Sequence, residues 1–218
     1  MKIHLFKLLF LSLFYLQGQV YTFQSNENGK TINHRILIDK SYLVETQFVN
    51  DPPQFILTRG GFYKKKGKVL SVNFEFNSNF EDDGFKKLEM NWSKDWEKVS
   101  KKPRDLNGKW LMAGRVTDQG ERRRDTSRPR KTMKFLLNGY FQWTAFNTET
   151  FQFFGSGGGY YTTENGKYTE YIQYFSRDNN RVGAVLPFNY SLNGSDWHHQ
   201  GYSSKGDPMH EIWSMRVK

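Results

Sequence analysis

The sequence predicts an all-β protein made of two tandem antiparallel β units, and two observations lead to this prediction. The first is a repeated order of aromatic and glycine residues, in which the segment 140–183 repeats the segment 42–84. The offset is 98 residues up to Tyr161 and 99 residues from Gly166, and so regular an offset indicates a duplicated unit. The second is a series of short alternating segments between Asn-Gly and glycine turns, with no convincing helical period.

The first unit is expected to be a run of short strands joined by tight turns. The clearest alternation lies in the segment 70–76, whose apolar residues are Leu70, Val72, Phe74 and Phe76. Asp51-Pro52-Pro53 is expected to be a turn, because proline has no N–H to donate to a strand ladder. The expected strands cover 20–23, 31–38, 42–48, 54–63, 70–76 and 88–92, and a last short one begins at 95.

The second unit follows a charged, proline-containing linker at 101–105, so we place the two domains at 19–103 and 104–218. Asn138-Gly139 is a strong hairpin signal, because both residues tolerate positive φ. Pro187 favours an edge or a bulge in the strand that contains it. The expected strands cover 110–116, 134–137, 140–146, 151–161, 168–175, 182–192 and 209–217.

The first residues predict export. Lys2 and Lys7 flank an almost wholly apolar run at 5–16, which is too short to cross a bilayer as a stable helix and is typical of a signal peptide. We expect residues 1–18 to be removed by cleavage after Gly18, which leaves a secreted or periplasmic protein; an uncleaved membrane anchor is the alternative. The chain has no cysteine, which excludes disulfides, thiolate metal sites and a cysteine nucleophile.

The positive charge gathers in one loop. The formal net charge is +10, and the segment 121–134 supplies much of it. Its candidate anion-binding residues are Arg122, Arg123, Arg124, Arg128 and Arg130. In an exported chain, an anionic polysaccharide or an anionic lipid surface is a better partner for such a loop than nucleic acid. The alternative is a solvated loop that keeps a sheet edge soluble.

A short motif opens the second unit. Gly108-Lys109-Trp110 stands at the start of its first strand, and Arg216 lies in its last strand. This pattern resembles the lipocalin-like (calycin) proteins, in which Gly-x-Trp begins a β-barrel. The resemblance implies that Gly108 and Trp110 start the barrel, that Trp110 plugs one end and that Arg216 stacks across its ring in a cation–π contact. We therefore expect a lipocalin-like barrel in the second unit and a shortened related copy in the first.

A second resemblance covers about half of the chain. The segments 123–133, 196–199, 204–208 and 211–213 are similar to a group of small exported bacterial proteins known only by the label membrane or secreted protein. This resemblance implies export and no particular activity.

The differences between the two units indicate where a ligand would bind. With the 99-residue offset, the apolar face of 70–76 is replaced by Thr169, Tyr171, Gln173 and Phe175. With the 98-residue offset that applies before Gly166, Glu45 is replaced by Trp143. Polar side chains on an inner face need partners, so we expect a cavity in the second unit lined by Trp143, Tyr171, Gln173 and Phe175. The alternative is a one-residue slip in the alignment, which would exchange the two faces.

The histidines near the C-terminus are the other candidates for chemistry. His198 and His199 are adjacent, so on a strand their side chains point to opposite faces, and His210 follows after a loop. We expect a non-catalytic protein that binds a small apolar or glycan-like ligand or interacts with the cell envelope, and the sequence implies no cofactor. The alternative is a secreted hydrolase or metal-dependent enzyme that uses His198, His199 and His210, which would require the three imidazoles to converge.

Overall fold

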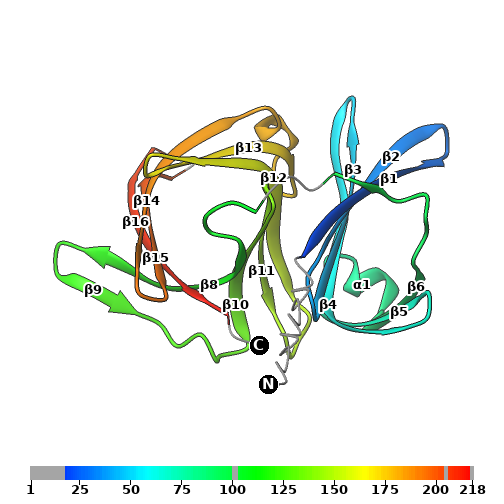
Figure 1. The fold of residues 1–218 in the computed structure, drawn as a ribbon, viewed down its shortest axis with the longest axis horizontal. Coiled ribbons are helices and arrows are strands. Elements are labelled where there is room, and N and C mark those ends of the chain that lie inside the picture. Colours follow the sequence, from blue (N-terminus) through cyan, green and yellow to red (C-terminus); the bar gives the residue numbers. More distant parts are fainter. Residues whose placement is uncertain (1–17, 100–102, 204–205, 217–218) are drawn as a thin grey trace, which may run out of the picture.

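The structure, a computed structural model, describes residues 18–99, 103–203 and 206–216, and nearly all of its regular structure is β-strand (Figure 1). The all-β prediction with two tandem antiparallel units is confirmed. The predicted signal peptide lies outside the described residues apart from Gly18, and so does part of the predicted linker. Among the described residues, no helix is long and apolar enough to cross a membrane.

The first unit is a seven-stranded antiparallel sheet in the order β6-β5-β4-β3-β2-β1-β7. Its strands are β1 (Gln19–Glu27), β2 (Lys30–Ile38), β3 (Tyr42–Asn50), β4 (Pro53–Lys66), β5 (Val69–Asn77), β6 (Lys87–Asn91) and β7 (Glu97–Lys98), with a short helix α1 (Phe80–Asp83) before β6. β1 runs further than its apolar residues suggest, because the Asn28-Gly29 turn, with φ of 50° and 75°, pairs its polar end with β2.

The second unit is a closed barrel. Its elements are β8 (Gly108–Thr117), β9 (Gly120–Arg123), β10 (Arg130–Leu137), β11 (Tyr140–Asn147), β12 (Phe153–Glu164), β13 (Lys167–Phe175), the 3-10 turn η1 (Asn179–Arg181), β14 (Val185–Asn193), β15 (Asp196–Tyr202) and β16 (Pro208–Met215). β10 to β16 form a continuous antiparallel series, and β8 pairs with both β16 and β10, so eight strands close the ring. β9 pairs only with β8 and extends from the ring as a hairpin (Figure 1).

The first unit follows the same strand order but stays open. β1 to β6 correspond in order to β8 and β10 to β14, whereas β15 and β16 have only the two-residue β7 as a counterpart. The segment 92–96 lies in place of the missing strands. Trp92 packs on Tyr21 with 4.8 Å between ring centroids, and Trp96 lies parallel to Phe23 at 5.6 Å. The first unit is therefore an open sheet, and the two tryptophans cover the side that the barrel closes with β15 and β16.

Matching bulges fix which side chains point inward. The register between β4 and β5 shifts between Gly60 and Gly61, and that between β12 and β13 shifts between Gly158 and Gly159, 98 residues later. The offset stays at 98 through the next hairpins, whose two-residue turns are 67–68 and 165–166. The 99-residue offset that the sequence predicts from Gly166 onward is therefore wrong for β5 and β13. It arose because glycine takes the first position in one turn and the second position in the other.

The two units pack face to face, with β10, β11 and β12 of the barrel against the sheet of the first unit (Figure 1). The shared apolar core consists of Val20, Leu37, Tyr42, Val44, Phe76, Leu111, Met133, Phe135, Leu137 and Phe146. A buried polar network also joins the two units: Thr46 donates to Gln142 (2.6 Å), and the Gln142 amide donates to Thr58 (2.7 Å). Burial of these apolar side chains between the two units holds them together.

Candidate functional site

One end of the barrel is filled by aromatic side chains. Trp110 is 3% exposed, and its indole N–H donates to the carbonyl of Leu106 (2.7 Å). Its ring meets Trp197 edge-on at 5.7 Å. Gly108 begins β8 with φ of +145°, a conformation that favours glycine, and a side chain there would meet Met215. Trp110 therefore lies inside the barrel and closes this end.

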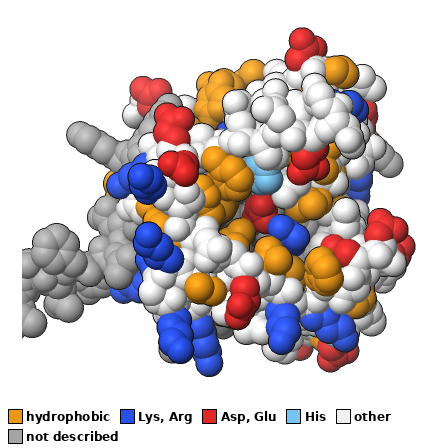
Figure 2. All heavy atoms as spheres, turned by 90° about the vertical axis from the view of Figure 1, so that its right-hand side faces the viewer, with side chains coloured by type: hydrophobic (Ala, Val, Ile, Leu, Met, Phe, Trp, Pro, Cys, Tyr) orange, Lys and Arg blue, Asp and Glu red, His pale blue; other side chains and the backbone are white. Residues whose placement is uncertain are grey.

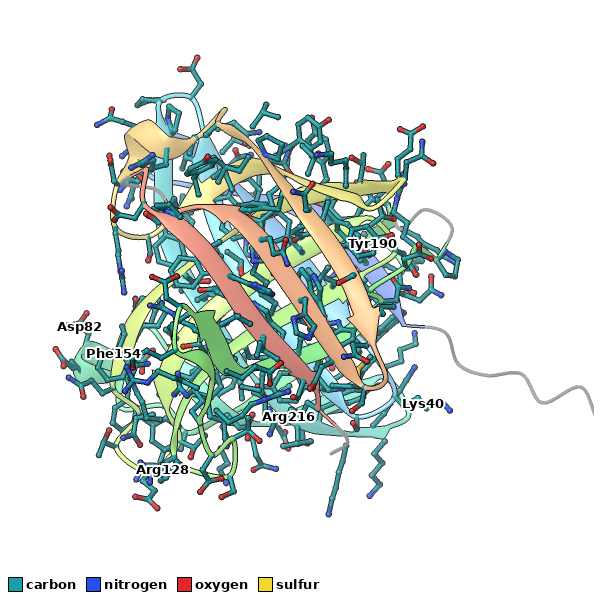
Figure 3. The ribbon with its side chains drawn as sticks, turned by 90° about the vertical axis from the view of Figure 1, so that its left-hand side faces the viewer. Lys40, Asp82, Arg128, Phe154, Tyr190 and Arg216 are labelled. Atoms are coloured by element: carbon teal, nitrogen blue, oxygen red, sulfur yellow. The ribbon has the colours of Figure 1, made fainter. Side chains whose placement is uncertain are left out.

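The other end of the barrel holds a cavity of about 390 Å³. Its apolar walls are Trp143, Phe175, Leu186, Phe188, Met209 and Trp213. Its polar lining is Arg115, Thr132, Lys134, Glu170, Arg177, His199, Tyr202, Ser203 and Glu211. Figure 3 shows Arg128 and Phe154 at this end of the barrel and Tyr190 at the opposite end. The basic loop therefore lies at the open end, beside the cavity.

A buried ion pair forms part of the cavity lining. Lys134 Nζ lies 2.7 Å from Glu170 Oε1, and both side chains are less than a tenth exposed. The hydroxyl of Tyr168 donates to the same carboxylate oxygen (2.9 Å). Burial, together with the adjacent Glu170 carboxylate, raises the pKa of Tyr168 well above its ordinary value. Because each buried charge needs its partner, these two residues present a nearly neutral surface to the cavity.

His199 and Glu211 form a second polar pair in the cavity. Nδ1 of His199 lies 3.4 Å from Oε2 of Glu211, and the indole N–H of Trp213 donates to that oxygen (3.1 Å). Burial, with the charge of Lys134, lowers the pKa of His199 to about 4. Burial alone would raise the pKa of Glu211, but the His199 hydrogen bond and Lys134 bring it below its ordinary value. His199 is thus neutral and Glu211 ionised at neutral pH.

The structure brings two of the four predicted ligand-binding residues together. Trp143 and Phe175 both line the cavity, with 5.7 Å between their ring centroids. Tyr171 instead stacks on Tyr160 at 4.4 Å on the outside of the barrel. Gln173 accepts a hydrogen bond from Arg35 of the first unit (2.6 Å). The bulge at Gly158 separates Phe175 from the other two, because it reverses the faces of β13 beyond Gln173.

The sequence analysis does not predict the inward-facing charges of Lys134 and Glu170. With the offset held at 98, Glu170 takes the position of Val72, and Lys134 takes that of Ile36. Both replacements put a charge where the first unit buries an aliphatic side chain. The replacement of aliphatic residues by charged ones could have revealed the ion pair from the sequence. The 99-residue offset matches Glu170 with Ser71 instead of Val72, so it conceals that replacement.

The three histidines do not converge. Nδ1 of His198 lies 2.9 Å from Nε2 of His210, and both residues are partly exposed, whereas His199 is 1% exposed and lies inside the barrel. The reason is the strand alternation, which sends neighbours to opposite faces. Within the part of the chain that the structure describes, no three histidine or carboxylate groups are placed to hold one metal ion.

The five predicted anion-binding arginines have different surroundings. Arg123 pairs with Asp196 (2.8 Å) and Glu121 (3.0 Å), and Arg128 lies 3.8 Å from Asp125. Arg122 and Arg124 are exposed.

Arg130 belongs to a cluster at the rim of the cavity. Its guanidinium lies 3.5 Å from the ring centroid of Phe154, and Arg177 donates to the Phe154 carbonyl (2.6 Å). Burial, with the charges of Arg124 and Arg177, lowers the pKa of Arg130. Arg124, Arg130 and Arg177 therefore concentrate positive charge near one side of the opening.

Arg216 has a different partner from the one predicted. Its two terminal nitrogens each donate to the carboxylate of Glu75 (both 2.7 Å), and its guanidinium lies over the rings of Tyr42 and Phe62. The predicted stack of Arg216 on Trp110 is therefore wrong. The backbone N–H of Arg216 donates to the carbonyl of Lys109 (2.7 Å), and from there the side chain points to the first unit.

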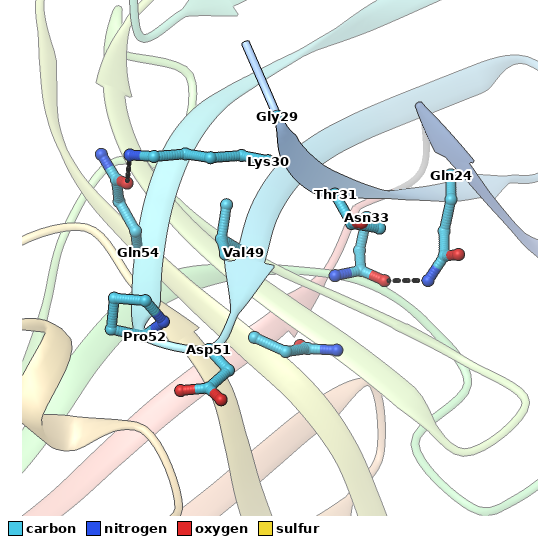
Figure 4. Close-up of a pocket in the computed structure, with 10 residues that line it drawn as sticks. Gln24, Gly29, Lys30, Thr31, Asn33, Val49, Asp51, Pro52 and Gln54 are labelled. Atoms are coloured by element: carbon cyan, nitrogen blue, oxygen red, sulfur yellow. Dashed lines mark hydrogen bonds between the residues drawn. The ribbon is translucent and has the colours of Figure 1, made fainter. Parts of the chain in front are cut away.

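A second hollow, of about 350 Å³, lies between the hairpin tips of the first unit (Figure 4). Gln24 donates to Asn33 (3.0 Å) and Lys30 donates to Gln54 (3.4 Å) across it. Its polar side chains thus bond to one another, in contrast to the aromatic walls of the barrel cavity.

Comparison of the sequence with protein-family models gives no match, and comparison with curated proteins gives none either.

Proposed function

We propose that the second unit binds, without chemistry, a small and mainly apolar ligand that carries an anionic group. The observation that carries this proposal is the cavity of about 390 Å³, with Trp143, Phe175 and Trp213 among its walls. Ligand cavities in proteins have about 300–1,000 Å³ and are mostly apolar with a few polar groups. The aromatic and aliphatic walls favour the apolar ligand over the glycan-like one.

The charges around the cavity support the anionic group. Arg115 and Arg177 line its opening, and Arg115 is well exposed. Inside, Lys134 neutralises Glu170. Burial of an unpaired charge is costly, so the apolar body of the ligand would lie inside while its acidic group stays near the arginines.

An anionic fluorescent probe tests this proposal. We expect 8-anilinonaphthalene-1-sulfonate to bind the folded chain and Leu186→Trp, which fills part of the cavity, to weaken binding at least about tenfold. Tyr171→Ala is the matched control, because Tyr171 lies on the outer face of the barrel. Circular dichroism checks that both variants are folded. Absence of probe binding, or equal binding by Leu186→Trp and the parent chain, would overturn the proposal.

We further propose that the barrel is lipocalin-like and that the two units arose by duplication. The Gly108-Lys109-Trp110 motif begins β8, and Trp110 lies inside the barrel, which supports the first proposal. Matching bulges 98 residues apart support the second. Export is proposed from residues 1–18, and mass measurement of the secreted protein tests whether it begins at Gln19.

The rim favours a second candidate function, attachment to an anionic envelope surface. Arg122 and Arg124 are exposed at the open end, and Arg130 and Arg177 lie near them. Such binding is electrostatic, so we expect association with vesicles that contain anionic phospholipid to fall steeply between about 0.05 and 0.5 M salt. Arg122→Gln with Arg124→Gln should reduce it, whereas association that is unchanged in this variant would count against the proposal.

The enzyme alternative based on the three histidines loses its geometric support. It required His198, His199 and His210 to meet around one pocket, and the barrel wall separates His199 from the other two.

A further inference from the structure

Three side chains of the first unit form a hydrogen-bonded line that the barrel does not share. The Oγ of Ser25 lies 2.9 Å from Nε2 of His34, and Nδ1 of His34 lies 3.1 Å from Oε1 of Glu45. A hydroxyl on one imidazole nitrogen and a carboxylate on the other is the arrangement that activates a serine nucleophile.

The strand register places these residues together. Ser25, His34 and Glu45 lie on β1, β2 and β3, which are neighbours in the sheet. His34 is directly opposite Phe23, so Ser25 stands one diagonal step away. Glu45 is directly opposite Ile36, one diagonal step from His34 on the other side. Diagonal neighbours on one face of a sheet lie within reach of long side chains.

The neighbours of Glu45 keep its carboxylate ionised, and this sets the direction of its hydrogen bond with His34. Glu45 is 3% exposed, and Arg59 (2.8 Å) and Gln47 (3.1 Å) donate to its carboxylate. Burial raises the pKa of Glu45, but the His34 hydrogen bond and the charge of Arg59 bring it down to about 2. An ionised Glu45 must accept the Nδ1–H of His34. In the tautomer that carries its proton on Nδ1, Nε2 is the acceptor for the Ser25 hydroxyl.

The ring of His34 is also fixed in place. Phe23 stacks on it with 4.2 Å between ring centroids and 15° between the planes, and Trp96 stacks on the other face of Phe23. A base held by packing on one side and by a carboxylate on the other needs little reorganisation to accept a proton.

Ser25 can be reached from solvent. It is only partly buried, and a groove of about 670 Å³ at the same edge of the sheet is lined by its neighbours Phe23 and Gln24 and by Trp96. Figure 2 looks onto this unit and shows a hollow that contains a histidine, with hydrophobic and charged side chains around it. The groove places the aromatic rings of Phe23 and Trp96 near the edge of β1, the strand that carries Ser25.

The edge of β1 also offers amides. The carbonyl of Val20 accepts from Val99 on the β7 side of the strand. Residues two apart direct their amides to the same side, so the N–H of Asn26 faces this edge. It lies beyond Tyr21 and Thr22, the residues that pair with β7. An amide that directly follows the nucleophile is one of the oxyanion donors in α/β-hydrolases.

We propose that Ser25 and His34 form a catalytic site for hydrolysis of small carboxylic esters, with Glu45 as the positioning residue. The Ser25 oxygen attacks the ester carbonyl while its proton passes to Nε2 of His34. The tetrahedral intermediate collapses, the C–O bond to the alcohol breaks, and His34 returns the proton to the leaving alkoxide. Water then attacks the acyl-serine, again through His34, and releases the carboxylic acid and free Ser25.

The site belongs to the first unit alone. The barrel carries Thr132 and Trp143 at the positions 98 residues after His34 and Glu45. The esterase proposal and the binding proposal therefore concern different units, and each can fail without the other. Leu186→Trp, which alters the barrel cavity, should leave the Ser25 chemistry unchanged.

A fluorophosphonate probe tests the nucleophile directly. We expect the full chain to be labelled on Ser25, as located by peptide mass spectrometry, with loss of one fluoride per chain. Ser25→Ala should abolish labelling, and His34→Gln should slow it about 100-fold. Ser71→Ala is the control, because Ser71 pairs with Glu89 on β5 and β6 of the same unit. No labelling of the parent chain, or labelling that persists in Ser25→Ala, would overturn the proposal.

The kinetic constants of a folded Glu45 variant show whether Glu45 positions His34 or only stabilises the fold. With 4-nitrophenyl acetate as substrate, we expect Glu45→Gln to lower kcat with KM nearly unchanged, because the imidazole loses orientation while the groove stays intact. Circular dichroism and thermal unfolding identify a folded variant. If Glu45→Gln is folded and its kcat equals that of the parent chain, the assigned role of Glu45 is wrong.

Discussion

Phe55 and Phe153 stack with 6.3 Å between their ring centroids and 6° between their planes, and they occupy the same position of the two units, 98 residues apart. Other contacts between the units occur twice, with each residue replaced by its counterpart 98 residues away in the other unit. Phe48 meets Tyr174 at 4.9 Å, and the counterparts of these two residues, Phe146 and Phe76, meet at 4.9 Å as well. Contacts that exchange in this way are those of a two-fold interface. The two units therefore meet as two subunits of a homodimer would.

The charged contacts of the interface differ between its two sides. Arg35 donates to Gln173 on one side of the interface, whereas on the other side Met133 takes the arginine position and Glu75 takes the glutamine position. Arg216 supplies the missing cation to Glu75. We expect Arg216→Ala to lower the free energy of unfolding by about 3 kcal/mol, measured by urea denaturation, because Glu75 keeps a largely buried charge without its partner.

A second substitution separates charge from packing in that prediction. Glu75→Gln copies the neutral residue at the matching position 173, so it should rescue much of the loss in Arg216→Ala. Equal stability of the Arg216→Ala single variant and the parent chain would show that the ion pair contributes nothing.

The buried imidazole of His199 predicts a loss of stability in mild acid. Its folded pKa is about 4, below the ordinary value of 6.5, so between these pH values the unfolded chain binds a proton that the folded chain does not. Stability therefore falls as the pH falls from 6.5 to 4. Relative to His199→Gln, the parent chain should lose about 3 kcal/mol over this window. Parallel pH profiles of the unfolding free energy would contradict this prediction.

Gly61 and Gly159 should be equally intolerant of a side chain, because both stand at the matching bulges. A methyl group at Gly61 would collide with the backbone carbonyl of Asn73, and one at Gly159 would collide with that of Tyr171. We expect each alanine variant to lose about 3 kcal/mol or more in urea denaturation. Gly67→Ala, in an open turn with φ of +60°, is the control and should lose only about 1 kcal/mol. Unequal losses at the two bulges would argue against their equivalence.

The ion pair in the cavity predicts a non-additive pair of substitutions. Lys134→Met should destabilise the chain by about 3 kcal/mol or more, because Glu170 keeps a buried charge, whereas Lys134→Met with Glu170→Leu should lose much less. Thermal and urea unfolding of both variants measures the difference. Additive effects of the two substitutions would show that the charges do not interact.

Local patterns predicted most of the strands but not their faces. The alternation of 70–76 and the Asn138-Gly139 turn depend on neighbours along the chain, and both are found where expected. The prediction that Tyr171 and Gln173 line the cavity depends on matching Gly166 with Gly67, which stand at different positions of their turns. A shift of one residue in a strand exchanges its inner and outer faces. Ser25 was not identified as a candidate because nothing near it in the sequence marks its contact with His34.

Period-two alternation and turn residues act over a few neighbouring positions, and they were enough to predict an all-β chain in two tandem units. Three features became visible only in the folded chain: the second unit closes while the first stays open, Arg216 meets Glu75, and Lys134 and Glu170 share a cavity. These features depend on the register between strands and on packing between segments far apart in the chain. Patterns among neighbouring residues contain no information about either.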